Sequence, residues 1–148
     1  VMWGANQAHW NWVVKASVPP TDLTLKGGDY RNLSIYFLFL PEEYASKTTG
    51  RLSELLRNEH ARVLMYVWGG RHNPGEILPS PYLGELGKSI ILQRAGTGTA
   101  SEQVNLAIDF RKAFGGNPSK LIGIAISADS DDTNYTILAT ISGFHIYE

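Results

Sequence analysis

The sequence predicts an all-β fold, an antiparallel β-sandwich of jelly-roll type with one or two short helices in its connections. Composition supports this: 43% of the residues are hydrophobic and only 18% are charged, and 15 glycines and 7 prolines divide the chain into short pieces. Several segments also alternate apolar and polar residues, as half-buried strands do. Because 148 residues can bury one sizeable core, we expect residues 1–148 to form a single β-sandwich domain.

Two strands are expected in the first third of the chain. Residues 9–15 place Trp10, Trp12 and Val14 on one face, which predicts a half-buried strand with an aromatic core face. Residues 33–40 are almost continuously apolar and aromatic. That pattern predicts a strand that is covered on both faces and central in its sheet.

A helix and a third strand are expected next. Three leucines at helical spacing within residues 51–60 predict a short surface helix, and residues 62–68 predict a strand. Residues 69–87 contain so many glycines and prolines that we expect a long loop without regular structure. Such a loop is a candidate binding surface.

The last third of the chain predicts three more strands and one more helix. Strands are expected over residues 89–94, 121–126 and 135–147. Apolar residues at a spacing of four, up to Phe114, predict a helix that Gly115 ends.

Charge and composition exclude several classes of protein. The net charge is −1 and the 13 lysines and arginines are scattered, so we expect no nucleic-acid partner. The absence of cysteine excludes disulfides, a thiolate nucleophile and cysteine-bound zinc. No apolar run approaches the roughly 20 residues that span a bilayer. The chain does not begin with methionine, and we expect it to lack N-terminal strands of a longer precursor.

An ordered set of short motifs resembles a bacterial family known as domain of unknown function 3047. The motifs are Trp10-x-Trp12-Val13, Gly28-Asp29, Tyr66-Val67-Trp68, Asp109-Phe110 and Asp129-x-Asp131-x-Thr133. The resemblance implies an exported β-sandwich protein, hence a periplasmic or extracellular location, and a further N-terminal region of several strands. It implies no assigned chemistry. The family pattern has an acidic residue where Tyr30 stands and a basic residue near Ser34, so an ion pair between those positions would be absent here.

An acidic corner joins the last two predicted strands. Asp129, Asp131 and Asp132 lie within four residues, and Thr133 adds a hydroxyl. Oxygen ligands at alternate positions suit Ca²⁺, which predicts a structural calcium site at these four residues. In the competing interpretation these side chains bond to their own backbone amides in an Asx-type turn.

Aromatic and polar residues in loops predict a ligand surface. Trp3, Tyr30 and Tyr82 lie in predicted loops, where an exposed ring can stack on the apolar face of a sugar. Arg71 and His72 lie together in the loop over residues 69–87. We therefore expect these five residues to contact a ligand.

Three functions remain open from the sequence. The first is a non-catalytic binding module, most simply one for carbohydrate. The second is a carbohydrate-active hydrolase or lyase that uses loop carboxylates. The third is a self-assembling protein, a homo-oligomer that pairs through an exposed sheet edge.

Overall fold

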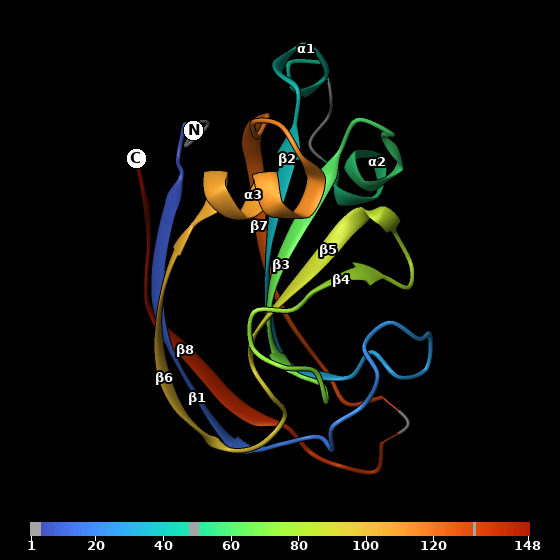
Figure 1. Ribbon diagram of the computed structural model, residues 1–148, viewed down its shortest axis with the longest axis vertical. Coiled ribbons are helices and arrows are strands. Elements are labelled where there is room, and N and C mark those ends of the chain that lie inside the picture. The colour runs from blue at the N-terminus through green and yellow to red at the C-terminus, as the bar shows by residue number, and fades with distance from the viewer. Residues whose placement is uncertain (1–3, 48–50, 132) are drawn as a thin grey trace.

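The computed structural model describes residues 4–47, 51–131 and 133–148. Within these ranges the chain forms eight strands and three short helices (Figure 1). They are β1 Gln7–Ala16, β2 Arg31–Leu40, α1 Glu42–Ala45, α2 Leu52–Arg57, β3 Arg62–Gly69, β4 Ile77–Ser80, β5 Gly84–Gln93, β6 Gly98–Asn105, α3 Leu106–Phe114, β7 Lys120–Asp129 and β8 Leu138–Tyr147. Helix α1 was not predicted.

Two sheets face each other, so the predicted all-β sandwich is confirmed. The three-stranded sheet has the order β6-β1-β8, and the five-stranded sheet has the order β4-β5-β3-β2-β7. Figure 1 shows the first sheet on the left and the second on the right. Neighbouring strands are antiparallel except β3 and β5, which are parallel. The expectation of a wholly antiparallel fold is therefore wrong for this pair.

The segment between β3 and β5 corrects a second prediction. Residues 69–87 were expected to lack regular structure, but they contain β4 and the start of β5. β4 pairs antiparallel with β5 and forms the edge of the sheet. Pro79 is tolerated there because an edge strand can leave one side without backbone hydrogen bonds. The return of the chain through β4 also explains how β5 comes to lie parallel to β3, since parallel neighbours need a long crossover.

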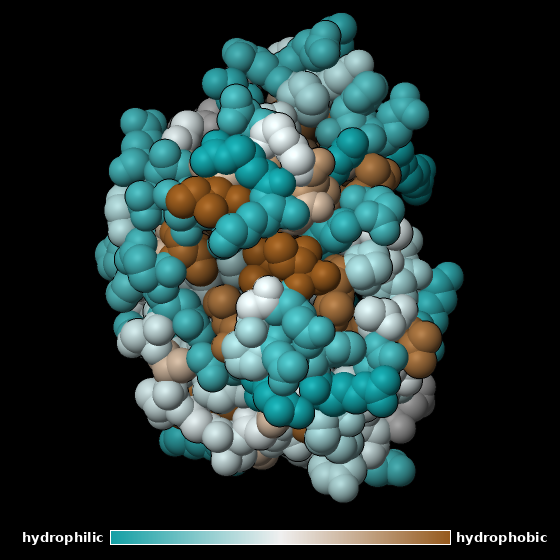
Figure 2. Space-filling model, in the orientation of Figure 1, coloured by the Kyte–Doolittle hydropathy of each residue, from teal (hydrophilic) through white to brown (hydrophobic). Residues whose placement is uncertain are grey.

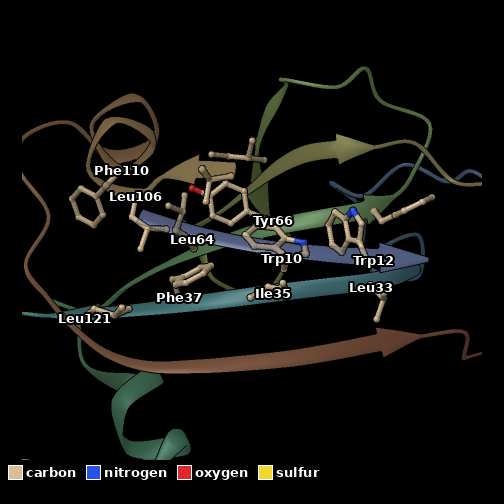
Figure 3. Close-up of a cluster of buried hydrophobic side chains, with 14 of the residues drawn as sticks. Trp10, Trp12, Leu33, Ile35, Phe37, Leu64, Tyr66, Leu106, Phe110 and Leu121 are labelled. Carbon is tan, nitrogen blue, oxygen red and sulfur yellow. The ribbon is translucent and has the colours of Figure 1, made fainter. Parts of the chain in front are cut away.

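The core between the sheets is aromatic (Figure 3). Trp10 and Trp12 project from β1 and are fully buried, as the alternation of residues 9–15 predicted. The indole of Trp10 packs against the Tyr66 ring, with centroids 5.7 Å apart, and Trp12 meets Trp68 edge-on at 5.6 Å. Burial of such large rings is a main source of the free energy that stabilises the sandwich.

Helix α3 lies across one end of the space between the sheets (Figure 1). The Asn105 side chain caps its start by accepting a hydrogen bond from the Ile108 N–H at 3.0 Å, and Gly115 at φ 78° follows its end. Phe110 packs edge-on against Phe39 of β2 at 5.1 Å. In Figure 2, apolar side chains are visible between this helix and the five-stranded sheet. The predicted helix is confirmed, and it closes the core at this end.

The outer face of the five-stranded sheet carries a second apolar cluster. β2 sends Ile35 and Phe37 to the core between the sheets, and Leu38 and Leu40 to the opposite side. The prediction that this strand is covered on both faces is confirmed. Leu55 of α2 packs on this outer side, as expected of the short helix predicted over residues 51–60.

The last two strands belong to different sheets. Among the described strands, β7 pairs with β2 alone and β8 with β1 alone, so the chain passes from one sheet to the other between them. Ile126 pairs with the core residue Ile35 and so projects to the core side, yet it remains 54% exposed. The sandwich is thus open along the edges of β7 and β8.

Candidate binding pocket

A pocket of about 820 Å³ lies on the outer face of the five-stranded sheet. β2, β3 and β7 form its floor, and α2 and the turn between β4 and β5 form its sides. Its lining consists of Asp29, Arg31, Tyr36, Leu38, Leu52, Leu55, Leu56, Val63, Met65, Ser80, Tyr82, Leu83, Ile122, Gly123, Ile124, Ala125, Ser127, Ala128, Asp129, Ser130 and Asp131. Small-molecule sites have volumes of roughly 300–1,000 Å³, so this pocket is large enough for a ligand.

One end of the pocket is apolar. Leu38, Val63 and Met65 are buried on its floor because the alternation of β2 and β3 turns them to this side. Leu55 of α2 covers them, while Leu52, one turn earlier on the same helix, is 57% exposed at the opening. Aliphatic side chains therefore surround this end from the sheet and from the helix.

The other end is polar and is built around Arg31. This side chain is 8% exposed and lies 3.5 Å from the carboxylate of Asp29. Its Nη1 donates a hydrogen bond of 3.2 Å to the Tyr36 hydroxyl oxygen and lies 3.7 Å from the sulfur of Met65. Ser127 also donates to the Tyr36 oxygen, at 2.9 Å. An opposite charge and an acceptor beside Arg31 offset part of the cost of burying it, although its Nε is buried without a hydrogen-bond partner among the described residues.

The register of the strands shows how the two ends are related. Arg31 pairs with Asp129 at one end of the β2–β7 ladder, and Leu38 pairs with Gly123 further along it. Seven residues of strand span about 23 Å, but the Arg31 side chain reaches along β2 to Tyr36 and Met65, so the polar part of the pocket adjoins the apolar part there. The pocket is an elongated amphipathic site.

The acidic corner forms part of the polar rim. Asp129 Oδ1 accepts a hydrogen bond of 2.9 Å from the Asp131 N–H, and Thr133 donates from its hydroxyl to the Ser130 carbonyl at 2.6 Å. This is the geometry of the Asx-type turn that was the competing interpretation. Asp132 lies outside the described residues. Among those that are described, no three His, Cys, Asp or Glu side chains gather to hold a metal, and the calcium site stays a prediction.

Of the residues predicted to contact a ligand, Tyr82 lies at this pocket. Its ring is 61% exposed at the rim, and Lys26 Nζ lies 5.5 Å from the ring centroid. Tyr30 is partly buried and does not line the pocket, although its neighbours Asp29 and Arg31 do. Trp3 lies outside the described residues.

Arg71 and His72 belong instead to a contact between two loops. Arg71 Nη2 lies 3.1 Å from Asp22 Oδ2, and His72 Nε2 accepts the Leu23 N–H at 3.1 Å. His72 Nε2 also lies 3.4 Å from Asp22 Oδ1, but a nitrogen that accepts a hydrogen bond carries no proton, so we assign this contact no ionic character. Hydrogen bonds from the Thr24 side chain and backbone, and then the Arg71 guanidinium, lower the pKa of Asp22. These residues join the loops and are not brought to the pocket.

The loop carboxylates considered for catalysis also have partners. Glu76 accepts the Asn73 N–H, and Glu85 lies 2.7 Å from Lys88 Nζ. Neither glutamate lines the pocket. A hydrolase or lyase therefore remains a prediction from the sequence.

Sequence reasoning missed the polar centre of the pocket. Asp29, Arg31 and Tyr36 were not predicted as site residues, because the prediction rested on exposed loop residues. One signal was present: Arg31 is the only charged residue of a largely apolar strand and lies two residues after Asp29. A charged side chain in a buried strand needs an opposite charge or a hydrogen-bond partner, so its presence indicates a polar site there.

Comparison with known proteins gives one match. A family model described as protein of unknown function (DUF3047) covers residues 5–145. The chain belongs to this family. No curated protein and no solved structure matches the chain. The resemblance noted in the sequence is confirmed, and the exported location that it implied stays a prediction.

The described helices are 4, 6 and 9 residues long. None of those in the described ranges has the length and apolar character required to cross a bilayer.

Proposed function

We propose that this DUF3047 protein is a non-catalytic binding module that holds a small amphipathic molecule in the pocket on the outer face of its five-stranded sheet. One observation carries the proposal: the pocket is apolar at one end and polar at the other, along the same pair of strands. Ligand sites typically combine an apolar lining with a few placed polar groups. An elongated molecule with an apolar tail and a polar end would match both ends of the pocket.

The apolar end supports the binding of a tail. Leu38 and Val63 are buried beneath α2, while Leu52 at the edge of the same space stays largely exposed. An aliphatic chain between them would remove apolar surface from water at about 25 cal/mol per Å². The ligand would take a place that no side chain of the described sheet or helix fills.

Binding of the neutral dye Nile red, followed by its fluorescence, tests the proposal. We expect saturable binding to the wild-type protein and at least about tenfold weaker binding to Leu52→Asp, which puts a charge at the apolar opening. Leu138→Asp is the matched control, because Leu138 is 56% exposed on β8 and does not line the pocket. Absent or non-saturable binding, or an equal loss in both variants, would contradict the proposal.

Carbohydrate binding is the second candidate. Tyr82 favours it, since its exposed ring lies at the same rim as Asp129 and Asp131. A ring in solvent offers an apolar face to a pyranose, and carboxylates accept hydrogen bonds from its hydroxyls. Retention on insoluble polysaccharide tests this candidate, with Tyr82→Ala as the variant that should elute early. No retention of the wild-type protein counts against it.

A further inference from the structure

The polar end of the pocket specifies the chemistry of the ligand's head group. Three carboxylates, those of Asp29, Asp129 and Asp131, line the pocket with one guanidinium, that of Arg31, which gives a formal charge of −2. Asp29 already neutralises Arg31 at 3.5 Å. An anionic head would approach the two further carboxylates, which repel it, and the described lining residues include no second cation to pair with it. Acidic amphiphiles are therefore disfavoured.

The same end also offers hydrogen-bond donors. The hydroxyls of Tyr36 and Ser127 share one hydrogen bond, and Arg31 donates to the Tyr36 oxygen, so one of the two hydroxyl protons is left to donate to a ligand. Arg31 has five N–H donors and makes one hydrogen bond to an oxygen among the described residues. An ammonium head could pair with Asp129 and Asp131, but it has no acceptor for the Arg31 donors and so would leave them unmatched. A purely cationic head therefore suits only one side of this end.

A hydroxyl group matches both the carboxylate acceptors and the hydrogen-bond donors at this end, because it donates one hydrogen bond and accepts two. Its oxygen can accept from the Tyr36–Ser127 hydroxyl pair and from Arg31, and its proton can go to Asp129 or Asp131. Several hydroxyls on one head would use both sides of the rim. Resting on the function proposed above, we infer that the ligand is a neutral amphiphile with a polyhydroxylated head and an aliphatic tail, of the alkyl glycoside type. The Tyr82 ring, exposed at the rim, is placed to cover the apolar face of such a head.

Competition against Nile red tests the inference with four probes below their micelle concentrations. Octyl glucoside, octanoate and octyltrimethylammonium share a tail and differ in head charge, and methyl glucoside has the head without the tail. We expect octyl glucoside to bind at least about tenfold more tightly than each of the other three. Equal competition by all three octyl compounds overturns the head-group inference and leaves the proposed function intact. Failure of the dye itself to bind overturns the proposed function.

Two variants locate the head group. Asp131→Asn and Tyr36→Phe should each weaken octyl glucoside binding by about tenfold while leaving Nile red binding unchanged. The first replaces a charged hydrogen-bond acceptor by a weaker neutral one, the second removes a hydroxyl, and neither removes apolar surface. Asp131 is exposed, so its variant is expected to fold normally. Glu85→Gln is the matched control, since Glu85 is exposed and lies outside the pocket lining. Unchanged affinity of both test variants for octyl glucoside overturns the inference.

Discussion

The hydroxyl of Tyr66 shows how one polar atom is accommodated in an aromatic core. It donates a hydrogen bond of 2.6 Å to Asp109 Oδ2, which joins β3 to α3. Burial first, and then the charge of Asp109, raise the pKa of Tyr66, so the phenol stays protonated and acts as a donor. Asp109 thus supplies the acceptor that satisfies this buried phenol.

Removal of that hydroxyl should destabilise the protein. Tyr66→Phe keeps the ring packing and deletes a hydrogen bond to a charged group, for which we expect a loss of about 1.5–3 kcal/mol in the free energy of unfolding. Urea denaturation measures it. Tyr147→Phe is the control, because the Tyr147 oxygen accepts from Gln103 on the surface, and a change within about 0.5 kcal/mol is expected. Similar losses in the two variants would contradict the role given to Tyr66.

Asp22 predicts a pH dependence of stability. Its pKa in the folded protein is lowered from 3.8, so its contribution is present above that value and is lost as the pH falls through the folded-state pKa. Asp22→Asn keeps an oxygen that can accept from the Thr24 N–H but carries no charge. Thermal melts should therefore show wild type more stable near neutral pH, with the difference shrinking below pH 3.8. A difference that stays constant well below that value would contradict the prediction.

Among the elements, the sequence pattern predicted best those strands whose burial follows one regular pattern along their whole length. The alternation of residues 9–15 and the apolar run of residues 33–40 correctly predicted β1 and β2. The failure lay in residues 69–87, where β4 and β5 form despite their glycines and prolines. Pairing with a neighbouring strand supplied hydrogen bonds that no local propensity could reveal.

Helix α3 depends on its cap as well as on its packing. Asn105→Ala removes the acceptor for the Ile108 N–H and should lower the free energy of unfolding by about 1 kcal/mol. Asn105→Asp is the matched control, since its carboxylate can accept the same hydrogen bond and suits the start of a helix. Urea denaturation of the two variants tests this. If Asn105→Asp lowered the free energy of unfolding as much as Asn105→Ala, capping would not be the cause.

At the scale of the whole molecule, the open side of the sandwich, along β7 and β8, is the surface most suited to self-association. β7 and β8 each have one unpaired edge, and Ile124 and Ile126 project to the core side while remaining exposed. Unpaired edges beside apolar surface invite another strand. The homo-oligomer expected from the sequence would be formed by this kind of pairing.

Size-exclusion chromatography with light scattering measures the oligomeric state. We expect a dimer or larger assembly of the 148-residue chain, and a shift to monomer in Ile126→Lys, because a lysine at an edge disfavours strand addition. Lys88→Ala on β5, an interior strand of the sheet, is the control and should leave the assembly unchanged. A stable wild-type monomer would contradict the prediction.

The sequence by itself determined the fold class, the family, most strands and the aromatic core, because the periodicity of side chains along a strand follows directly from which face is buried. Only the tertiary structure decided the parallel pairing of β3 with β5, the assignment of β7 and β8 to different sheets, and the pocket. Strand register brings Arg31, Tyr36 and Asp129 to one pocket, and Leu55 lines the same pocket from a helix elsewhere in the chain. Such contacts depend on which strands lie side by side, and that is fixed by the packing of the whole domain.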